Sequence, residues 1–319
     1  MTASSHDHVA LSVVIPVFEC AHNLPELNRR LEAILGAMGV AYEVVYVDDG
    51  STDGAWDTIE DLAAHRPQVR GARLSRNFGQ QAAITAGLSL ARGHQVVVMD
   101  GDLQEEPEVI PRLVTEAARG YDVVLTVREA RSQTFMRRAT GRGYFKLRNA
   151  LTGAPTGVDN GTMSLLSRRV VDAFLCVGDV HREYLALLGW LGFKQASIVV
   201  PHLSRVDGKS SYTWRRLLRA GWSGVLFQTT VLLRWVVAAG LGAAAAGFAL
   251  AIYDIWVYLH DGSLVGYTSL AVLILLVGGS ILIATGIVGL YVGATFEQAK
   301  GRPLFVVADE VGSAEARAP

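Results

Sequence analysis

Two stretches near the C-terminal end of this chain are almost free of charged residues. Residues 235–259 contain one acid, Asp254, and residues 267–292 contain no charged residue at all. A helix of about 20 apolar residues crosses the hydrocarbon core of a bilayer, and each stretch is longer than that. The pattern predicts two transmembrane helices within residues 228–292, so the rest of the chain is expected to fold beside a membrane.

The basic residues around these stretches predict their orientation. The connecting loop, residues 260–266, contains no Lys or Arg, whereas Arg and Lys residues lie close to both outer ends. Because cytoplasmic flanks carry the excess of positive charge, we expect both termini in the cytoplasm, at an inner or plasma membrane. Residues 1–10 form a polar tail without the apolar core of a signal peptide. Residues 293–319 form a cytoplasmic tail, which we expect to be mobile after Val307.

The part of the chain before these stretches has the pattern of an α/β domain. Apolar runs closed by turn residues predict strands at residues 11–17, 42–47, 69–74, 95–99 and 121–127. Apolar residues three or four positions apart predict helices at residues 23–38, 52–64, 78–91 and 107–119. This alternation predicts βαβ units and a largely parallel, Rossmann-like sheet within residues 11–212. Ligands bind such sheets at the carboxyl ends of the strands.

The most informative strand end is residues 100–104, with the sequence DGDLQ. Two carboxylates, Asp100 and Asp102, follow the strand at 95–99 with one residue between them. Hard divalent cations prefer oxygen ligands and often retain positions for substrate phosphates. The motif therefore favours a Mg²⁺ or Mn²⁺ site that receives a phosphorylated donor. An acidic turn without a ligand is the alternative.

Three further strand ends carry polar motifs. They are residues 16–19 (PVFE), 48–53 (DDGSTD) and 76–81 (RNFGQQ). An acid at a strand end can accept hydrogen bonds from a base or a ribose, and the free amides at a helix start favour anions. Each motif taken alone also fits an ordinary strand–turn–helix connection, in which Asp or Ser caps the helix.

Taken in order, the four motifs resemble those of the family 2 glycosyltransferases. Residues 190–194 (WLGFK) and 205–212 (RVDGKSSY) are similar to the polyprenyl-phosphate group of that family, which includes dolichol-phosphate mannose synthase, bactoprenol glucosyltransferase and undecaprenyl-phosphate aminoarabinose transferase. The resemblance covers residues 11–307. It implies a type A glycosyltransferase domain that moves a sugar from a UDP- or GDP-linked donor to undecaprenyl or dolichyl phosphate, with inversion and with Mg²⁺ or Mn²⁺ as cofactor.

The resemblance also implies roles for individual residues. At the nucleotide sugar it implies Pro16, Phe18, Glu19, Asp48, Asp49, Asn77, Asp100 and Gly101. At the metal it implies Asp100, Asp102 and Gln104. The residues implied in catalysis are Asp102, Asp159 and Arg205, and those implied at the lipid phosphate are Arg128, Arg131, Arg205, Lys209, Ser210 and Tyr212. The Asn-Gly pair after Asp159 is closer to the aminoarabinose type than to the mannose and glucose types.

Two segments combine basic residues with aromatic rings. Residues 128–148 hold seven Arg or Lys residues and one acid, and residues 205–219 hold five and one. Helices of this composition lie at membrane surfaces, with rings toward the lipid and charges toward the head groups. We expect interfacial helices at residues 131–151 and 213–227, and the alternative for each is an ordinary amphipathic core helix.

Composition and local spacing limit the remaining functions. The formal net charge is −1, which gives no argument for a nucleic-acid partner, and the two cysteines have no metal-binding spacing. The glycine- and alanine-rich residues 240–247 permit close helix approach and so a homo-oligomer. A processive polysaccharide synthase is an alternative, although five residues separate Gln228 from Arg234 where that class has two. A non-catalytic membrane scaffold for sugar lipids is the second alternative.

Overall fold

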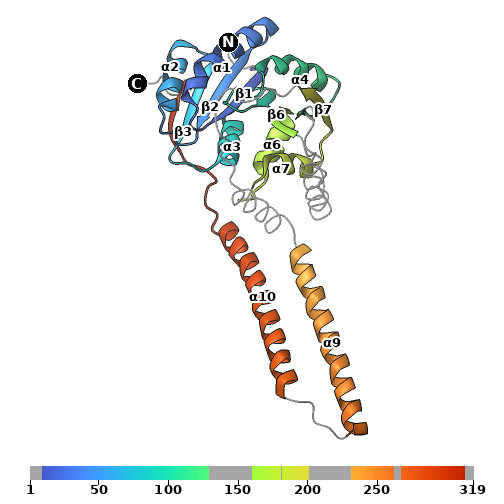
Figure 1. Cartoon of the computed structure of the whole chain (residues 1–319). Helices are drawn as coiled ribbons and strands as arrows, with labels where there is room; N and C mark the ends of the chain where they lie inside the picture. Colours follow the sequence, from blue (N-terminus) through green and yellow to red (C-terminus); the bar gives the residue numbers. More distant parts are fainter. Residues whose placement is uncertain (1–8, 129–159, 181, 201–230, 262–266, 313–319) are drawn as a thin grey trace, which may run out of the picture. The chain divides into compact units, whose positions relative to one another are not determined.

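The computed structural model describes residues 9–128, 160–180, 182–200, 231–261 and 267–312. These residues belong to two compact units. The first contains the described residues up to 200 together with residues 303–312, and the second contains residues 231–302. Figure 1 shows the elements of both units along the chain.

The first unit is built on a parallel group of four strands. These are β1 (Leu11–Val17), β2 (Tyr42–Asp48), β3 (Val69–Leu74) and β4 (Gln95–Val98), in the spatial order β4-β1-β2-β3. The strands are rich in Val and Ile and buried on both faces, as is usual for parallel strands that helices cover. Their positions agree with the prediction to within one residue at each end.

Four further strands make the sheet mixed rather than largely parallel. They are β5 (Val123–Arg128), β6 (Asn160–Ser167), β7 (Gln195–Val200) and β8 (Val307–Val311). Strand β6 runs antiparallel to both β4 and β5, β7 runs parallel to β5, and the full order is β7-β5-β6-β4-β1-β2-β3-β8. The expectation of a largely parallel sheet is therefore correct only for β1 to β4.

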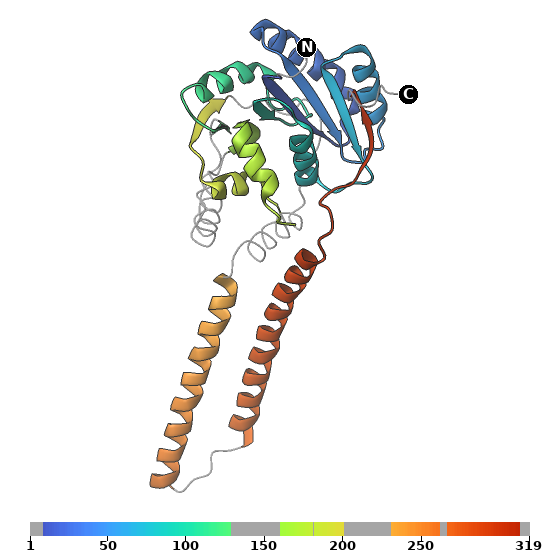
Figure 2. The ribbon, with the colours of Figure 1, turned by 180° about the vertical axis from the view of Figure 1, so that it is seen from behind.

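Strand β8 corrects a second expectation. Residues 307–311 pair antiparallel with β3, so this part of the expected mobile tail is the outermost strand of the sheet. The amide of Ser75 also donates to the carbonyl of Val306 at 2.9 Å. Figure 2 shows β8, in red, beside β3.

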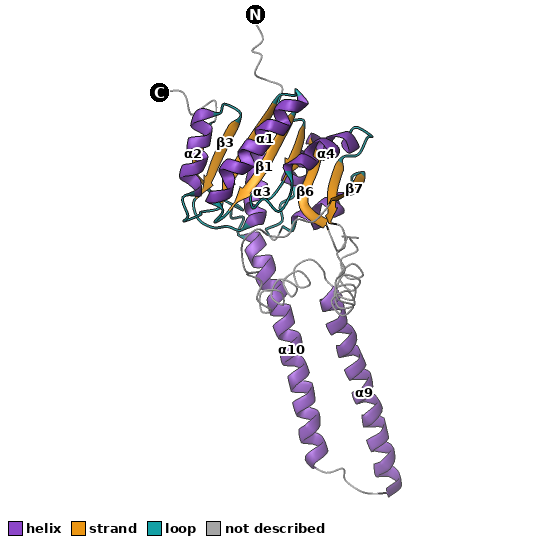
Figure 3. Cartoon of the chain, turned by 45° about the horizontal axis from the view of Figure 1, so that its top comes forward, coloured by secondary structure: helices purple, strands orange, loops and turns teal. Residues whose placement is uncertain are grey.

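Helices cover both faces of the sheet (Figure 3). One face carries α1 (Leu24–Met38), α2 (Ala55–His65) and α4 (Ile110–Ala117), and the other carries α3 (Gln80–Leu90), α6 (Arg168–Cys176) and α7 (Tyr184–Leu191). Alternate strand residues serve the two layers, so that Ile15 packs with the first group and Val14 with the second. Single 3₁₀ turns at Ala21–Asn23 and Pro107–Val109 precede α1 and α4.

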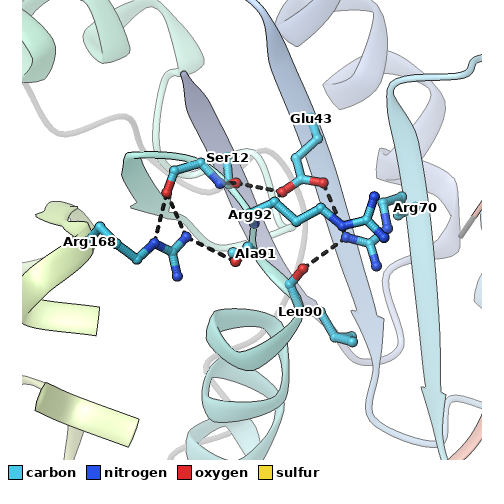
Figure 4. A network of polar contacts seen from close by, with 8 residues as sticks. Ser12, Glu43, Arg70, Leu90, Ala91, Arg92 and Arg168 are labelled. Atoms are coloured by element: carbon cyan, nitrogen blue, oxygen red, sulfur yellow. Dashed lines mark hydrogen bonds and ion pairs between the residues drawn. The ribbon is translucent and has the colours of Figure 1, made fainter. Parts of the chain in front are cut away.

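A buried polar network joins the amino ends of the parallel strands (Figure 4). The Glu43 carboxylate accepts from the Ser12 hydroxyl at 2.6 Å, from the Arg92 amide at 2.6 Å and from Arg70 Nη1 at 3.1 Å. Arg168 donates to the carbonyl oxygens of residues 91 and 93. Buried charges are tolerated when they are paired and hydrogen-bonded in this way. The network fixes the strand starts and leaves the opposite, carboxyl edge for other chemistry.

The second unit consists of two long helices, α9 (Val231–Asp261) and α10 (Tyr267–Ala299). They cover the two uncharged stretches, which confirms helical structure there. Among the residues that the structure describes, one stretch, Val277–Ala299, is long and apolar enough to cross a membrane, and the corresponding apolar stretch of α9, Val236–Ala249, is shorter. The two-span prediction therefore stays a prediction. The predicted interfacial helices at 131–151 and 213–227 lie outside the described residues.

Candidate active site

The carboxyl ends of β1, β2, β3 and β4 bring the four sequence motifs to one edge of the sheet. Asp48 is the last residue of β2, and its side chain is fully buried. Its Oδ1 accepts from the amide of Ser51 at 3.0 Å, and its Oδ2 lies 3.7 Å from Arg73 Nε. In this structure Asp48 therefore holds the turn after β2, and its predicted contact with a nucleoside stays a prediction.

Asp49 joins the turn after β2 to the loop after β3. Its two carboxylate oxygens accept from the amides of Phe78 at 2.7 Å and Gly79 at 2.8 Å. Burial raises the pKa of Asp49, and these two hydrogen bonds oppose that rise by stabilising the charged form. This contact explains why α3 begins at Gln80 and not at Phe78, since residues 76–79 form a loop held by Asp49.

Gly50 allows these two loops to touch. Its φ is +72°, and a Cβ at this position would lie 2.8 Å from the carbonyl carbon of Arg76 and 2.8 Å from the amide nitrogen of Asn77. Both the left-handed backbone and the lack of space exclude other residues. The glycine in the DDGSTD motif therefore has a packing reason of its own, and it fixes Asn77 at the same edge.

The loop after β1 is fastened to the turn after β2. The Glu19 carboxylate accepts from the amide and the hydroxyl of Thr52 at 3.0 and 2.9 Å, and the Asp53 carboxylate accepts from the amide of Ala21 at 2.8 Å. Glu19 has a φ of +52°, a strained value for a residue with a side chain. Phe18, beside it, leaves 51% of its surface exposed at this edge. An exposed aromatic ring next to a polar loop can stack against a flat ligand.

The Asp100–Gln104 loop lies against the loops after β1 and β3. Gln80 Nε2 donates to Asp100 Oδ1 at 2.7 Å, and the amide of Gln104 donates to Asp102 Oδ1 at 3.1 Å. Gly101 is buried, and a Cβ there would lie 3.4 Å from both Cys20 Sγ and the carbonyl oxygen of Pro16. The same close packing buries Cys20 and raises the pKa of its thiol to about 11.

The chemistry of this edge fits a hard divalent cation that shares its ligands with a substrate. Asp100 and Asp102 supply carboxylate oxygens, and both side chains are partly exposed. Within the described residues, no group of three or more His, Cys, Asp or Glu side chains could enclose a metal ion. A cation held here would need further oxygen ligands, and Mg²⁺ sites with one or two carboxylates commonly take them from substrate phosphates and water.

Two residues of this edge were not among those predicted. Gln80, in the RNFGQQ motif, positions Asp100, and Glu105, directly after the DGDLQ motif, accepts from the amide of Met163 in β6 at 3.0 Å. Gln80 lies within a recognised motif and Glu105 directly after one, but neither contact could be deduced from spacing. The partner of Glu105 lies on β6, a strand that sequence periodicity did not predict.

The residues predicted at the acceptor lie almost entirely outside the described part of the chain. Those that lie outside it are Asp159, Arg131, Arg205, Lys209, Ser210 and Tyr212. Arg128 is the last residue of β5, and only its backbone is described. The structure therefore brings together the residues predicted at the donor and gives no test of those predicted at the lipid phosphate.

Comparison with known proteins identifies this combination of motifs. The family model described as Glycosyl transferase family 2 matches residues 12–175. An undecaprenyl-phosphate 4-deoxy-4-formamido-L-arabinose transferase of Pseudomonas paraeruginosa is 37% identical, over 97% of this chain and 92% of that protein. An uncharacterized glycosyltransferase of Bacillus subtilis, YkcC, is 31% identical over 96% of this chain and 95% of that protein.

Solved structures give a weaker likeness. The mannosyltransferase PcManGT from Pyrobaculum calidifontis, in complex with GDP-Man and Mn²⁺, is 16% identical with a TM-score of 0.45, over 91% of this chain and 88% of that one. Mannosyl-3-phosphoglycerate synthase from Rubrobacter xylanophilus is 16% identical with a TM-score of 0.48, over 73% and 75% of the two chains. Scores at this level carry no argument about the site.

Proposed function

The chain belongs to glycosyltransferase family 2, and from this premise we propose that it transfers a sugar from a nucleotide-sugar donor to a polyprenyl phosphate. One observation carries the proposal: four strand-end loops are tied together at one edge of the sheet, and the two carboxylates Asp100 and Asp102 lie in the last of them. The acceptor class comes from the name of a relative that is 37% identical over nearly the whole chain.

The donor would bind across the tied loops. The exposed Phe18 ring would stack against the base, and the loop after β2 would contact the nucleoside through Asp48, Asp49 or the backbone they hold. Asp100 and Asp102, with Gln104 beside them, would hold Mg²⁺ or Mn²⁺ on the diphosphate. Such a cation neutralises the charge that develops on the leaving nucleoside diphosphate. Gln80 would keep the Asp100 carboxylate oriented before the donor arrives.

The acceptor chemistry favours direct attack. A polyprenyl phosphate is already an anion at neutral pH, so it depends on a general base less than a hydroxyl acceptor does. Its phosphate oxygen would bond to the anomeric carbon as the bond from that carbon to the diphosphate oxygen breaks, which inverts the configuration. We propose Arg128, Arg131, Arg205, Lys209, Ser210 and Tyr212 at the lipid phosphate, where an arginine fork can bond two oxygens at once. Asp159 would orient the acceptor.

The helical unit supports a position at the membrane. Many of the apolar side chains that the structure describes on α9 and α10 are exposed, with Phe248 at 70% and Leu282 at 75% of their full surface. Helices that are apolar all round need a protein or a lipid cover. Strand β8 follows α10 and belongs to the same sheet as β1 to β7. The described residues up to 200, before α9, and residues 303–312, after α10, are therefore parts of one folded unit. We propose two spans, with this unit on the cytoplasmic side.

A transfer assay tests the proposal. Membranes that contain the chain are supplied with undecaprenyl or dolichyl phosphate, Mn²⁺ or Mg²⁺, and a panel of labelled nucleotide sugars, including a UDP-linked 4-formamido pentose. We expect one donor to give a chloroform-soluble sugar phosphate that depends on both the cation and the lipid. If no donor labels the lipid fraction, while the same membranes release free sugar from a donor, the acceptor class is wrong and the enzyme class stands.

A further inference from the structure

The antiparallel ladder between β4 and β6 ends where the candidate site begins. Its last pair is Val98 with Ser164. Beyond that pair, β4 turns away into the Asp100–Gln104 loop, whereas β6 continues toward Asn160. Two backbone amides, those of Asp100 and Met163, therefore lie just beyond the end of this ladder. Buried backbone donors of this kind need an acceptor.

The side chain of Glu105 supplies that acceptor. Its Oε1 accepts from the amide of Met163 at 3.0 Å, and its Oε2 lies 3.5 Å from the amide nitrogen of Asp100, at the long limit of a hydrogen bond. Glu105 is 8% exposed, so its charge is almost removed from water. A carboxylate is buried at acceptable cost only when such donors satisfy it. One side chain thus bridges the Asp100–Gln104 loop and β6 at the point where the backbone ladder between β4 and β6 ends.

Gly161 lies close to this carboxylate. A Cβ at position 161 would lie 2.8 Å from Glu105 Oε1 and 2.7 Å from Thr126 Oγ1, so an alanine there would push against both side chains. The hydroxyl of Thr126 donates to the carbonyl of Met163 at 2.9 Å, and the pairing of β5 with β6 shifts register at this point. Both polar groups of the Met163 backbone are therefore held by side chains, Glu105 on one side and Thr126 on the other.

We propose that Glu105 is a positioning residue, which fixes the Asp100–Gln104 loop against the start of β6 so that donor and acceptor are aligned. The inference rests on the proposed function, because Asp159, which is proposed to orient the acceptor, directly precedes β6. Misplacement of reacting groups by about 1 Å can cost about 100-fold in rate. Glu105 itself touches neither substrate in this scheme and acts through the two segments that it joins.

The test compares Glu105→Gln with Glu106→Gln in the full chain, purified in detergent or lipid nanodiscs. Glutamine has the size of glutamate, but an NH₂ group replaces one of the two carboxylate oxygens, and this group donates and cannot accept from a backbone N–H. We expect Glu105→Gln to lower kcat at least tenfold while the KM for the nucleotide sugar changes less than threefold. Glu106→Gln makes the same chemical change one residue away, at a side chain outside this bridge, and should keep both constants.

Hydrogen exchange measured without substrate separates this proposal from the proposed function. In Glu105→Gln, peptides that cover residues 99–104 and 160–164 should exchange at least tenfold faster, with the rest of the sheet unchanged and with both peptides of Glu106→Gln at the wild-type rate. If the wild type transfers no sugar to a polyprenyl phosphate, the proposed function fails, and exchange still decides whether Glu105 joins the two segments. Unchanged exchange in both peptides overturns the link.

Gly161→Ala provides a second variant, in case Glu105→Gln folds poorly. The added methyl group pushes against Glu105 Oε1, so this variant should show the same loss of kcat with Glu105 still present. Because both changes break one bridge, the double variant should lose less than the product of the two single losses. Fully multiplicative losses would show that the two changes act independently and overturn the shared bridge, and faster exchange with an unchanged kcat would show that Glu105 has a structural role only.

Discussion

The two halves of the sheet are held together differently. In the half made of β1 to β4, consecutive strand-end loops are joined by short side-chain contacts: Glu19 with Thr52, Asp49 with Phe78 and Gly79, and Gln80 with Asp100. In the half made of β5 to β7, the described contacts at the corresponding edge are those of Glu105, Thr126 and Ser164 with β6 and α7. The first half has an edge whose loops are tied to one another, and the second half has a strand edge attached to it.

This difference follows from chain connectivity. Parallel strands joined by right-handed crossovers place their carboxyl ends at one edge of the sheet, so the loops that follow the strands can contact one another there. Strand β6 reverses direction, and its start is what reaches the candidate site. The proposed donor side thus consists of loops that follow strands, and the start of β6 lies beside them through its contact with Glu105.

The largest loss of activity is expected from a substitution in the Asp100–Gln104 loop. Asp102→Asn should lower sugar transfer by about a thousandfold, because several kcal/mol of charge stabilisation depend on the cation that this carboxylate would hold. Asp309→Asn, on the exposed strand β8, is the matched control and should be silent. Turnover near the wild-type rate in Asp102→Asn, with the cation still required, would remove Asp102 from the metal site.

The second prediction compares the packing of the two halves through their cysteines. Cys20 lies in the loop after β1 and is buried. Burial raises the pKa of its thiol to about 11, so at pH 8 about 0.1% of this thiol is ionised. Cys176, at the end of α6, is exposed. We expect iodoacetamide to modify Cys176 first and Cys20 roughly 100-fold more slowly than an ordinary thiol. Mass spectrometry follows the labelling of each cysteine in the folded protein. Equal labelling rates of Cys20 and Cys176 would show that the loop after β1 opens freely.

Two adjacent glutamines provide a third test. Gln80 donates to Asp100, whereas the side-chain oxygen of Gln81 accepts from the amide of Tyr184 at the start of α7. Gln80→Ala should raise the KM for the donor about tenfold, the value of one charge-assisted hydrogen bond, and leave the melting temperature unchanged. Gln81→Ala should instead lower the melting temperature, because it leaves the Tyr184 amide without its acceptor. A lower melting temperature in Gln80→Ala together with a raised KM in Gln81→Ala would contradict the division between the two halves.

The smallest effect is expected at the outer edge of the first half. Gly312 has a φ of +73°, and a Cβ there would lie 2.3 Å from the carbonyl oxygen of Val69. Gly301 has a similar φ, +60°, with nothing within 4 Å. Gly312→Ala should therefore lower the free energy of unfolding by about 1–2 kcal/mol more than Gly301→Ala, the usual cost of overpacking. Equal thermal shifts in the two variants would mean that β8 contributes little to the edge of β3.

The sequence alone predicted the first half well and the second poorly. Strands β1 to β3 and the loops after them are local patterns, because each strand, turn and helix occupies one short segment. Strands β6, β7 and β8 pair with partners far away in the chain, and periodicity carries no information on such partners. The RNFGQQ motif was expected to open a helix, but the Asp49 contact that delays α3 to Gln80 depends on another strand.

The candidate site divides in the same way. Asp48, Asp49, Asp100 and Asp102 were found because each directly follows a recognisable strand. Glu105 was passed over because its partner, the amide of Met163, is a backbone group with no signature in the sequence. The long-range network around Glu43 was invisible for the same reason, although it fixes the strand starts on which the opposite edge depends.

The position of β8 has a consequence for the order of folding during synthesis. The strand that protects the edge of β3 is translated only after both long helices, α9 and α10. Until then β3 presents unpaired amide and carbonyl groups, which invite pairing with other chains. Closure of the sheet must therefore wait until both helices have been synthesised, and a delay at this stage would prolong the interval in which the nascent protein can aggregate.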